Sequence, residues 1–230
     1  MDTHVLPNPQ AVADFAADLI SSELQRPRSN LGLAGGSTPK ATYNALATKE
    51  VDWARIPVWL ADERWVPPTD DQSNRRMALE AFSGAIDTSL IPVPWHLGID
   101  AIIGAALYED ALKAHLPTTN GHITPDLVVL GIGDDGHTAS LFPGTDALTA
   151  SGEYVANWVP KLDTWRVTAT VSMLQSARKL LFLVTGEGKA QTMAQIMTPS
   201  SNHPAAVVAR GAQSALWVLD AQAGSLLEAQ

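Results

Sequence analysis

The stretch DLVVLGIGDDGH, residues 126–137, joins an uninterrupted apolar run to a glycine-rich turn that carries two aspartates and a histidine. Four consecutive apolar residues, 127–130, are typical of a strand buried on both faces, as in a parallel sheet. In open α/β sheets, ligands bind in the crevice at the carboxyl ends of the strands. This stretch therefore predicts both a fold class and a place for a functional site.

The same alternation of short apolar runs and helical patterns extends along the chain. We expect helices over 9–25, 38–49, 73–82, 100–116 and 187–197, and a surface loop over 117–125. We expect strands over 30–36, 56–62, 92–98, 126–133, 155–160, 166–172, 179–186 and 214–220. Strands separated by helices indicate a mainly parallel sheet covered on both faces, in a single α/β domain spanning 1–230.

Composition excludes several classes of protein. The 230 residues suffice to bury a core, and the absence of cysteine excludes disulfides, thiol nucleophiles and cysteine-bound metal, which is compatible with a cytoplasmic location. No membrane partner is expected, since no apolar window is long enough to span a bilayer and no secretory signal is visible. With a net charge of −9 and no basic stripe, no nucleic-acid partner is expected either. An anionic small molecule would need a local cluster of donors.

One such cluster is predicted at GGSTP, residues 35–39, between an expected strand and an expected helix. Free N–H groups at a helix start, with the hydroxyls of Ser37 and Thr38, would make a cradle for an anion. The alternative is an ordinary turn in which Ser37 or Thr38 caps the helix. The glycine and lysine spacing of a P-loop is absent, so a nucleotide is not implied.

Cations near other strand ends favour a phosphate as the anion. In GEGK (186–189), Lys189 stands at a helix start, where the helix dipole disfavours a cation unless an anion binds there. Arg166, which opens the expected strand 166–172, has a similar position. The alternative for both is a solvated surface side chain.

ADERW, residues 61–65, places Asp62, Glu63 and Arg64 after another apolar run. Strand alternation would direct some of these side chains into the crevice. The alternative is a local ion pair at a loop edge, which would contribute little to stability.

His137 is the best candidate for acid–base chemistry. Gly136 lets the backbone turn, and Asp135 can bind one ring nitrogen, which leaves the other as a general base near neutral pH. The alternative is a turn with an exposed histidine. Asp134 and Asp135 could hold Mg²⁺, but nothing requires it, and no clustered zinc ligands occur, so no metal is expected.

Taken in order, GGSTP, ADERWVP with SN eleven residues after Asp62, LGIGDDGHTASLFPG and GEGKA resemble the 6-phosphogluconolactonase family. This is one branch of a superfamily that also contains glucosamine-6-phosphate deaminase, and the resemblance covers roughly residues 10–220. It implies a Rossmann-like three-layer α/β sandwich. It also implies hydrolysis of a sugar-phosphate lactone, 6-phosphogluconolactone, to 6-phosphogluconate in the oxidative pentose phosphate pathway, with no metal or organic cofactor.

The resemblance also implies roles for individual residues. His137 would activate water, Asp135 would orient it, and Arg64 would contact the substrate. The substrate and phosphate ligands would be Gly35, Gly36, Ser37, Thr38, Asp62, Gly133, Arg166 and Lys189. Backbone N–H groups of the turn 131–137 are candidate donors to the oxyanion. One departure precedes Arg166, where KLDTW (161–165) replaces a proline-rich approach.

Two other functions remain open. The deaminase branch would carry a glutamate five residues after the histidine as part of a proton relay, and Phe142 occupies that position here. A non-catalytic sugar-phosphate sensor on the same fold is the third hypothesis. Both a monomer and a homodimer are compatible with the sequence.

Overall fold

The structure, a computed structural model, describes residues 2–96 and 98–227. Its main sheet has the strand order β1-β11-β10-β7-β2-β3, and each neighbouring pair is parallel. The six strands are β1 (Asp2–Leu6), β2 (Leu31–Leu33), β3 (Val58–Leu60), β7 (Leu127–Leu130), β10 (Lys179–Val184) and β11 (Ala215–Asp220). The chain order reverses between β2 and β7, which is where such sheets bind ligands.

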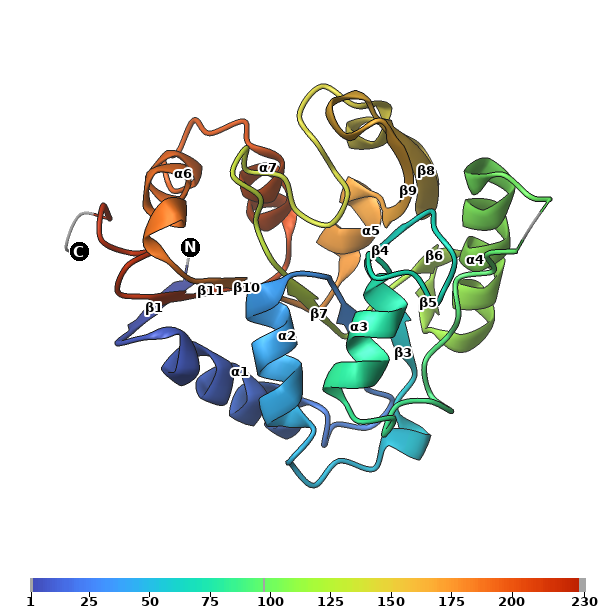
Figure 1. The fold of residues 1–230 in the computed structure, drawn as a ribbon, viewed down its shortest axis with the longest axis horizontal. Helices are drawn as coiled ribbons and strands as arrows, with labels where there is room; N and C mark the ends of the chain where they lie inside the picture. Colours follow the sequence, from blue (N-terminus) through green and yellow to red (C-terminus); the bar gives the residue numbers. More distant parts are fainter. Residues whose placement is uncertain (1, 97, 228–230) are drawn as a thin grey trace.

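Helices cover both faces of this sheet (Figure 1). One face carries α1 (Pro9–Glu23), α2 (Ser37–Leu46) and α3 (Asn74–Ala81), and the other carries α5 (Val171–Ser176), α6 (Ala190–Ile196) and α7 (Pro204–Gly211). The predicted three-layer, Rossmann-like sandwich is therefore confirmed. Short 3₁₀ turns are η1 (Trp53–Arg55), η2 (Asp146–Leu148), η3 (Pro160–Leu162) and η4 (Glu187–Lys189).

The helix starts follow from local chemistry. The side chain of Asn8 accepts a hydrogen bond from the backbone N–H of Ala11, and Pro9 follows as the first residue of α1, where a missing N–H has no cost. Asp100 caps α4 (Ala101–His115) in the same way. These side chains satisfy N–H groups that have no partner inside the helix.

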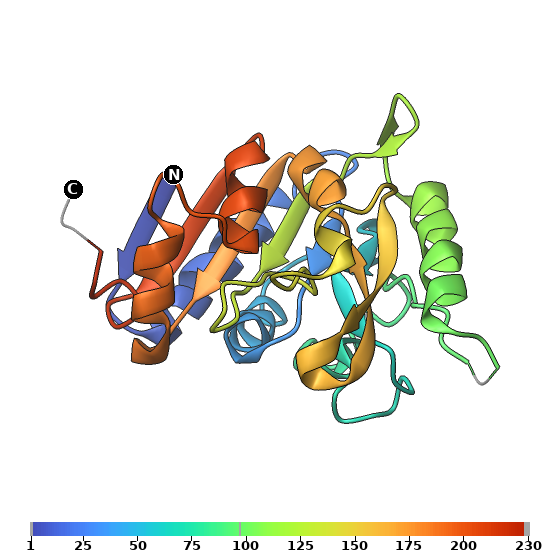
Figure 2. The same ribbon diagram turned by 90° about the horizontal axis from the view of Figure 1, so that it is seen from above.

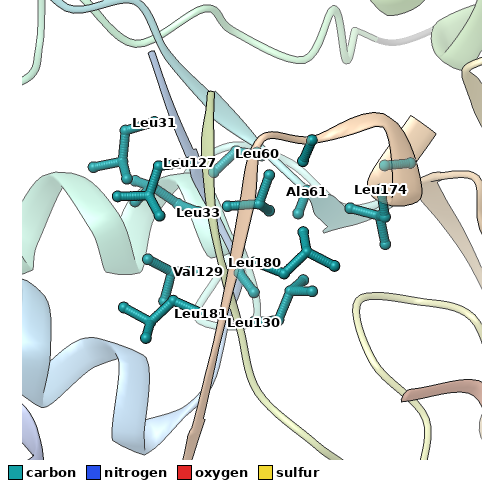
Figure 3. Close-up of a cluster of buried hydrophobic side chains, with 14 of the residues drawn as sticks. Leu31, Leu33, Leu60, Ala61, Leu127, Val129, Leu130, Leu174, Leu180 and Leu181 are labelled. Carbon is teal, nitrogen blue, oxygen red and sulfur yellow. The ribbon is translucent and has the colours of Figure 1, made fainter. Parts of the chain in front are cut away.

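The core lies between the sheet and its helices. Leu31, Leu127 and Leu181 come from three neighbouring strands and point to the same face of the sheet (Figure 3), each with no exposed surface. Burying one such side chain favours folding by roughly 1.5–3 kcal/mol. This packing makes the sheet a rigid base for the polar segments at its carboxyl edge.

A second, antiparallel sheet lies beside the first. It has the order β4-β9-β8 and consists of β4 (Asp62–Arg64), β8 (Tyr154–Val159) and β9 (Thr164–Ala169), with α4 packed beyond it (Figure 2). The strands predicted at 155–160 and 166–172 are thus real but do not join the parallel sheet. Only a few residues connect β8 to β9, and a short connection can join only antiparallel strands.

Three local predictions are wrong. Residues 92–96 form no strand, because Pro92 and Pro94 lack the N–H groups that a ladder needs, and Leu97 lies outside the described residues. The predicted loop 117–125 contains a short hairpin of β5 (Thr118–Thr119) and β6 (His122–Ile123). The strand expected to extend to residue 172 ends at Ala169, because α5 begins two residues later, at Val171.

Three elements have no counterpart among the predictions. These are the edge strand β1 and the helices α5 and α7. Across residues 2–96 and 98–227, none of the helices has both the length and the apolarity needed to cross a membrane.

Candidate active site

A cleft of about 250 Å³ opens where the carboxyl ends of β2, β7 and β10 meet the antiparallel sheet. Its lining includes Gly35, Gly36, Ser37, Thr38, Asp62, Arg64, Asn74, Gly131, Gly133, His137, Arg166 and Lys189. The fold thus brings together all the site residues expected from the sequence except Asp135, which contacts His137 from outside the lining. Their chemical roles remain predictions.

The first wall is the turn from β2 into α2. Gly36 has φ of 116°, a left-handed conformation that favours glycine, and it directly precedes the helix. Ser37 and Thr38 stand in the first helical turn, beside its free N–H groups. The Thr38 hydroxyl lies 2.7 Å from the hydroxyl of Thr185, which ties this wall to the end of β10. This wall therefore presents several donors and no carboxylate.

The second wall carries His137 and Asp135. The Asp135 Oδ1 atom lies 2.5 Å from Nδ1 of His137 and also accepts the backbone N–H of His137 at 3.2 Å. One face of the imidazole stacks on the ring of Phe142, with the ring centroids 3.9 Å apart. A side chain at Gly133 would collide with this ring, since a Cβ built there would lie 2.0 Å from Nδ1. The imidazole is therefore fixed by a carboxylate, an aromatic ring and a glycine.

The charges of this pair are set by their surroundings. Burial raises the pKa of Asp135, but hydrogen bonds from Lys161 and His137 outweigh it and bring the pKa down to about 2. Burial lowers the pKa of His137, and the hydrogen bond and charge of Asp135 oppose that change. Near neutral pH an ionised carboxylate therefore accepts from Nδ1–H of a neutral imidazole, which leaves Nε2 able to accept a proton.

Two arginines form the third wall. Arg64 of β4 and Arg166 of β9 are register partners in the antiparallel sheet. The Nε atom of each is buried and has no hydrogen-bond partner among the described residues. Burial lowers the pKa of Arg166, and the nearby charge of Arg64 lowers it further, while Asp62 acts in the opposite direction. Buried charged donors without partners point to an anionic ligand.

The acids next to Arg64 have structural partners. Asp62 accepts from the Ser140 hydroxyl at 2.6 Å and from the Asn74 amide at 3.2 Å. Glu63 accepts the backbone N–H groups of Asn74 and Arg75, so it holds the start of α3. Of the two alternatives for this segment, a local ion pair is wrong: within the described part of the chain neither acid pairs with a lysine or arginine.

Asn74 is a lining residue that the sequence reasoning did not assign. Its amide donates to the backbone oxygen of Asp62 at 2.8 Å and its own Oδ1 lies against Gly35. The dipeptide SN at 73–74 is part of the sequence pattern that resembles the family. No feature of the neighbouring sequence indicated, however, that Asn74 would connect Gly35, which follows β2, with Asp62 of β4. That contact depends on how α3 packs.

Lys189 lies at the end of η4, directly before α6, and reaches the cleft. Its ammonium forms an ion pair with Asp134, and the hydrogen bond from Lys189 lowers the pKa of that aspartate. The turn that precedes Lys189 is held in place because the backbone N–H of Gly186 donates to the buried carboxylate of Asp220 at 3.0 Å. The cation therefore already has a weak, exposed partner in this structure.

Three of the expected oxyanion donors are engaged inside the turn. The N–H of Gly133 donates to the His137 carbonyl at 2.9 Å, and the N–H of Gly136 donates to the Gly133 carbonyl at 3.0 Å. The N–H of His137 donates to Asp135. These three groups are therefore poor candidates for the role. Among the described residues, no group of three or more His, Cys, Asp or Glu side chains is arranged to hold a metal ion.

The chain matches known proteins over nearly its whole length. A family described as glucosamine-6-phosphate isomerases/6-phosphogluconolactonase matches residues 8–217. A 6-phosphogluconolactonase of Synechocystis sp. is 35% identical over 235 residues, with 97% of each chain covered. A crystal structure of 6-phosphogluconolactonase from Leishmania guyanensis is 28% identical, covers 99% of each chain and has a TM-score of 0.86.

The likeness in fold extends to a protein with another activity. A structure of a monomeric glucosamine-6-phosphate deaminase has a TM-score of 0.81 at 22% identity and covers 98% of this chain and 100% of its own. At that identity the likeness concerns the fold alone. The distinction between the two activities must therefore be argued from side chains in the cleft.

Proposed function

This chain belongs to the glucosamine-6-phosphate isomerase/6-phosphogluconolactonase family, and we propose that it hydrolyses 6-phosphogluconolactone to 6-phosphogluconate, with His137 as the general base. The observation that carries this proposal is the imidazole of His137, held at Nδ1 by Asp135 and available at Nε2, in a cleft lined by cations. A neutral imidazole next to an anion site suits the hydrolysis of a phosphorylated ester.

The chemistry needs one base and one oriented water. His137 takes a proton from water through Nε2 as the water oxygen attacks the lactone carbonyl, and Asp135 stabilises the imidazolium that forms. The tetrahedral intermediate then collapses, the bond between the carbonyl carbon and the ring oxygen breaks, and the imidazolium returns its proton to that oxygen. The product is the open-chain acid, and His137 is neutral again.

The remaining walls hold the substrate. Ser37, Thr38 and the N–H groups at the start of α2 bind the phosphate together with Lys189. Arg64 and Arg166 supply charged donors to substrate oxygens, which gives the buried Nε–H groups the partners that they lack. Donors on three sides suit a ligand with a phosphate at one end and a polar ring at the other.

Phe142 argues against the deaminase reaction. It stands where that branch would carry a relay glutamate, and its ring supports His137 instead. A phenyl ring cannot transfer a proton. A non-catalytic sensor would not require a histidine paired with a carboxylate, so this reading ranks third.

The test compares two substrates on the purified protein. The lactone is generated in situ and its loss is followed against the spontaneous rate, and glucosamine 6-phosphate is tested in parallel for release of ammonia. We expect rapid loss of the lactone and no ammonia. Release of ammonia would replace this proposal with the deaminase, and binding of both phosphates without turnover would favour the sensor.

Replacing Lys189 by methionine is expected to raise KM for the lactone about 10- to 30-fold with little change in kcat. The phosphate is far from the bond that breaks, so its contact with Lys189 is equally strong in the ground and transition states. Initial rates over a range of lactone concentrations measure both constants. An unchanged KM would remove Lys189 from the phosphate site.

Replacing Asp134 by asparagine is expected to change KM in the opposite direction, lowering it about two- to threefold. In the free protein Asp134 competes with the substrate for Lys189, and an exposed ion pair of this kind contributes only a few tenths of a kcal/mol up to about 1 kcal/mol. The same kinetic series measures it. A higher KM in this variant would mean that Asp134 helps to place Lys189 instead of competing for it.

A further inference from the structure

We propose that Lys161 is a positioning residue for the His137–Asp135 pair, delivered to it by the turn between β8 and β9. The Lys161 ammonium contacts Oδ2 of Asp135, the oxygen that His137 does not use. Lys161 lies within the segment KLDTW (161–165), where this sequence departs from the family pattern. The inference rests on the proposed function, since it concerns how the general base is held.

The contacts of Asp135 explain why this lysine matters. Oδ1 accepts both Nδ1–H and the backbone N–H of His137, and Oδ2 accepts from Lys161. A carboxylate held by only one of its oxygens can still rotate about its last side-chain bond, whereas one held at both oxygens cannot. Lys161 therefore fixes the plane of the carboxylate, and through it the plane of the imidazole.

Lys161 also contacts the other support of the imidazole. Its Nζ lies 5.2 Å from the centroid of the Phe142 ring, within the range of a cation–π contact. That same ring stacks against His137. One ammonium thus touches both groups that bound the imidazole, the carboxylate on one side and the aromatic ring on the other.

The hairpin between β8 and β9 fixes the position of Lys161 relative to Asp135. Asp163 adopts a left-handed conformation with φ of 48° and closes the turn that follows Lys161. Cross-strand partners Trp158 and Trp165 pack together just below the turn, with ring centroids 5.6 Å apart. The next residue on β9 is Arg166, in the cleft wall, so the same rigid hairpin places both cations.

The charges around His137 predict the direction of the effect. On its own turn lie Asp134 and Asp135, and Asp62 faces it from β4; all three favour the protonated imidazole. From the hairpin, Lys161 disfavours it. Arg166 of β9 lies on the Phe142 ring, 5.5 Å from its centroid. Removing Lys161 removes a cation and leaves the carboxylates, so the pKa of His137 should rise.

The first experiment is the kinetics of Lys161→Met as a function of pH. We expect kcat near neutral pH to fall about five- to tenfold with KM unchanged, and the acidic limb of the kcat profile to move up by about half a unit to one unit. Lys161→Arg should restore most of the rate. The matched control is Lys49→Met, because Lys49 pairs with the exposed Asp18 outside the cleft. The side chain of Lys161 is 54% exposed, so its loss should barely change Tm.

The second experiment follows the ring resonances of His137 by NMR titration of the free protein, assigned by their absence in His137→Gln. It needs no turnover, so it still tests Lys161 if the proposed reaction is wrong. A higher His137 pKa in Lys161→Met, but not in Lys49→Met, supports the proposal. An unchanged titration overturns it, even where activity is lost together with Tm, because that result would mean a merely structural role.

Discussion

Replacing His137 by glutamine is expected to lower kcat about 10³-fold while KM stays within about threefold of its original value. Glutamine is of similar size and can still form hydrogen bonds, but its amide does not accept a proton near neutral pH. The proposed base would act only in the transition state, whereas the proposed phosphate contacts of Ser37, Thr38 and Lys189 would be untouched.

Two measurements check this expectation. Steady-state rates give kcat and KM, and calorimetric binding of 6-phosphogluconate reports directly on the phosphate site. His115→Gln is the matched control, because His115 is the exposed last residue of α4 and its Nδ1 lies 2.7 Å from the carbonyl oxygen of Ala111. Turnover near the wild-type rate in His137→Gln would show that another group activates the water.

Replacing Asp135 by asparagine is expected to cost between about 10² and 10⁴ in kcat. Lys161 is a charged donor, so it would outcompete the backbone N–H of His137, which donates to Asp135 at 3.2 Å, for the amide oxygen of the new side chain and would turn the NH₂ group toward His137. That NH₂ would donate to Nδ1 and force the ring proton onto Nε2, the nitrogen that must accept a proton. The imidazole would then stay in place in the wrong tautomer.

The pH profile separates this explanation from simple unfolding. In the wild-type protein Asp135 has a pKa of about 2, so the acidic limb of kcat should reflect His137 alone. The variant should lose rate at every pH and keep its Tm within a few degrees. Asp110→Asn, an exposed acid-to-amide change on α4, serves as the control. A loss that is largest near neutral pH and disappears toward low pH, as the acidic limb moves down, would mean that Asp135 acts through its charge and not through the tautomer.

The double variant Asp135→Asn with Lys161→Met sharpens the argument. Without Lys161 the amide is free to present its oxygen to Nδ1–H, so part of the lost rate should return. The effects of the two substitutions would then be non-additive, as is expected for residues in one hydrogen-bond network. Simple addition of the two losses would exclude the tautomer explanation.

The parallel sheet and the position of its site could be predicted from the sequence because both depend on local patterns. The side chains of residues 127–130 are all apolar and point alternately to the two faces of the sheet, so both faces must be covered. Helices cover both faces of a parallel sheet, which is why the run predicts a parallel strand. Residues 131–137 then emerge at the carboxyl edge together with 35–39. The main departure, at 92–96, also had a local cause in Pro92 and Pro94, whose effect on hydrogen bonding outweighed the apolar pattern.

The contacts that complete the site depend on the tertiary structure. Arg64 faces Arg166 because β4 pairs with β9 in one particular register, and a shift of one residue would turn Arg166 to the other face of the sheet. Asn74 reaches Asp62 only because α3 packs against β4. Lys161 meets Asp135 only because the hairpin between β8 and β9 folds over the turn 131–137.

The sequence by itself therefore determined the fold class, the edge of the sheet that carries the site and the chemical types gathered there. Only the tertiary structure decided which cation holds which carboxylate and which side chains from distant segments meet in the cleft. The physical reason is that burial and turn formation are read from neighbouring residues. Hydrogen-bond partners, in contrast, are set by register and packing between segments far apart in the chain.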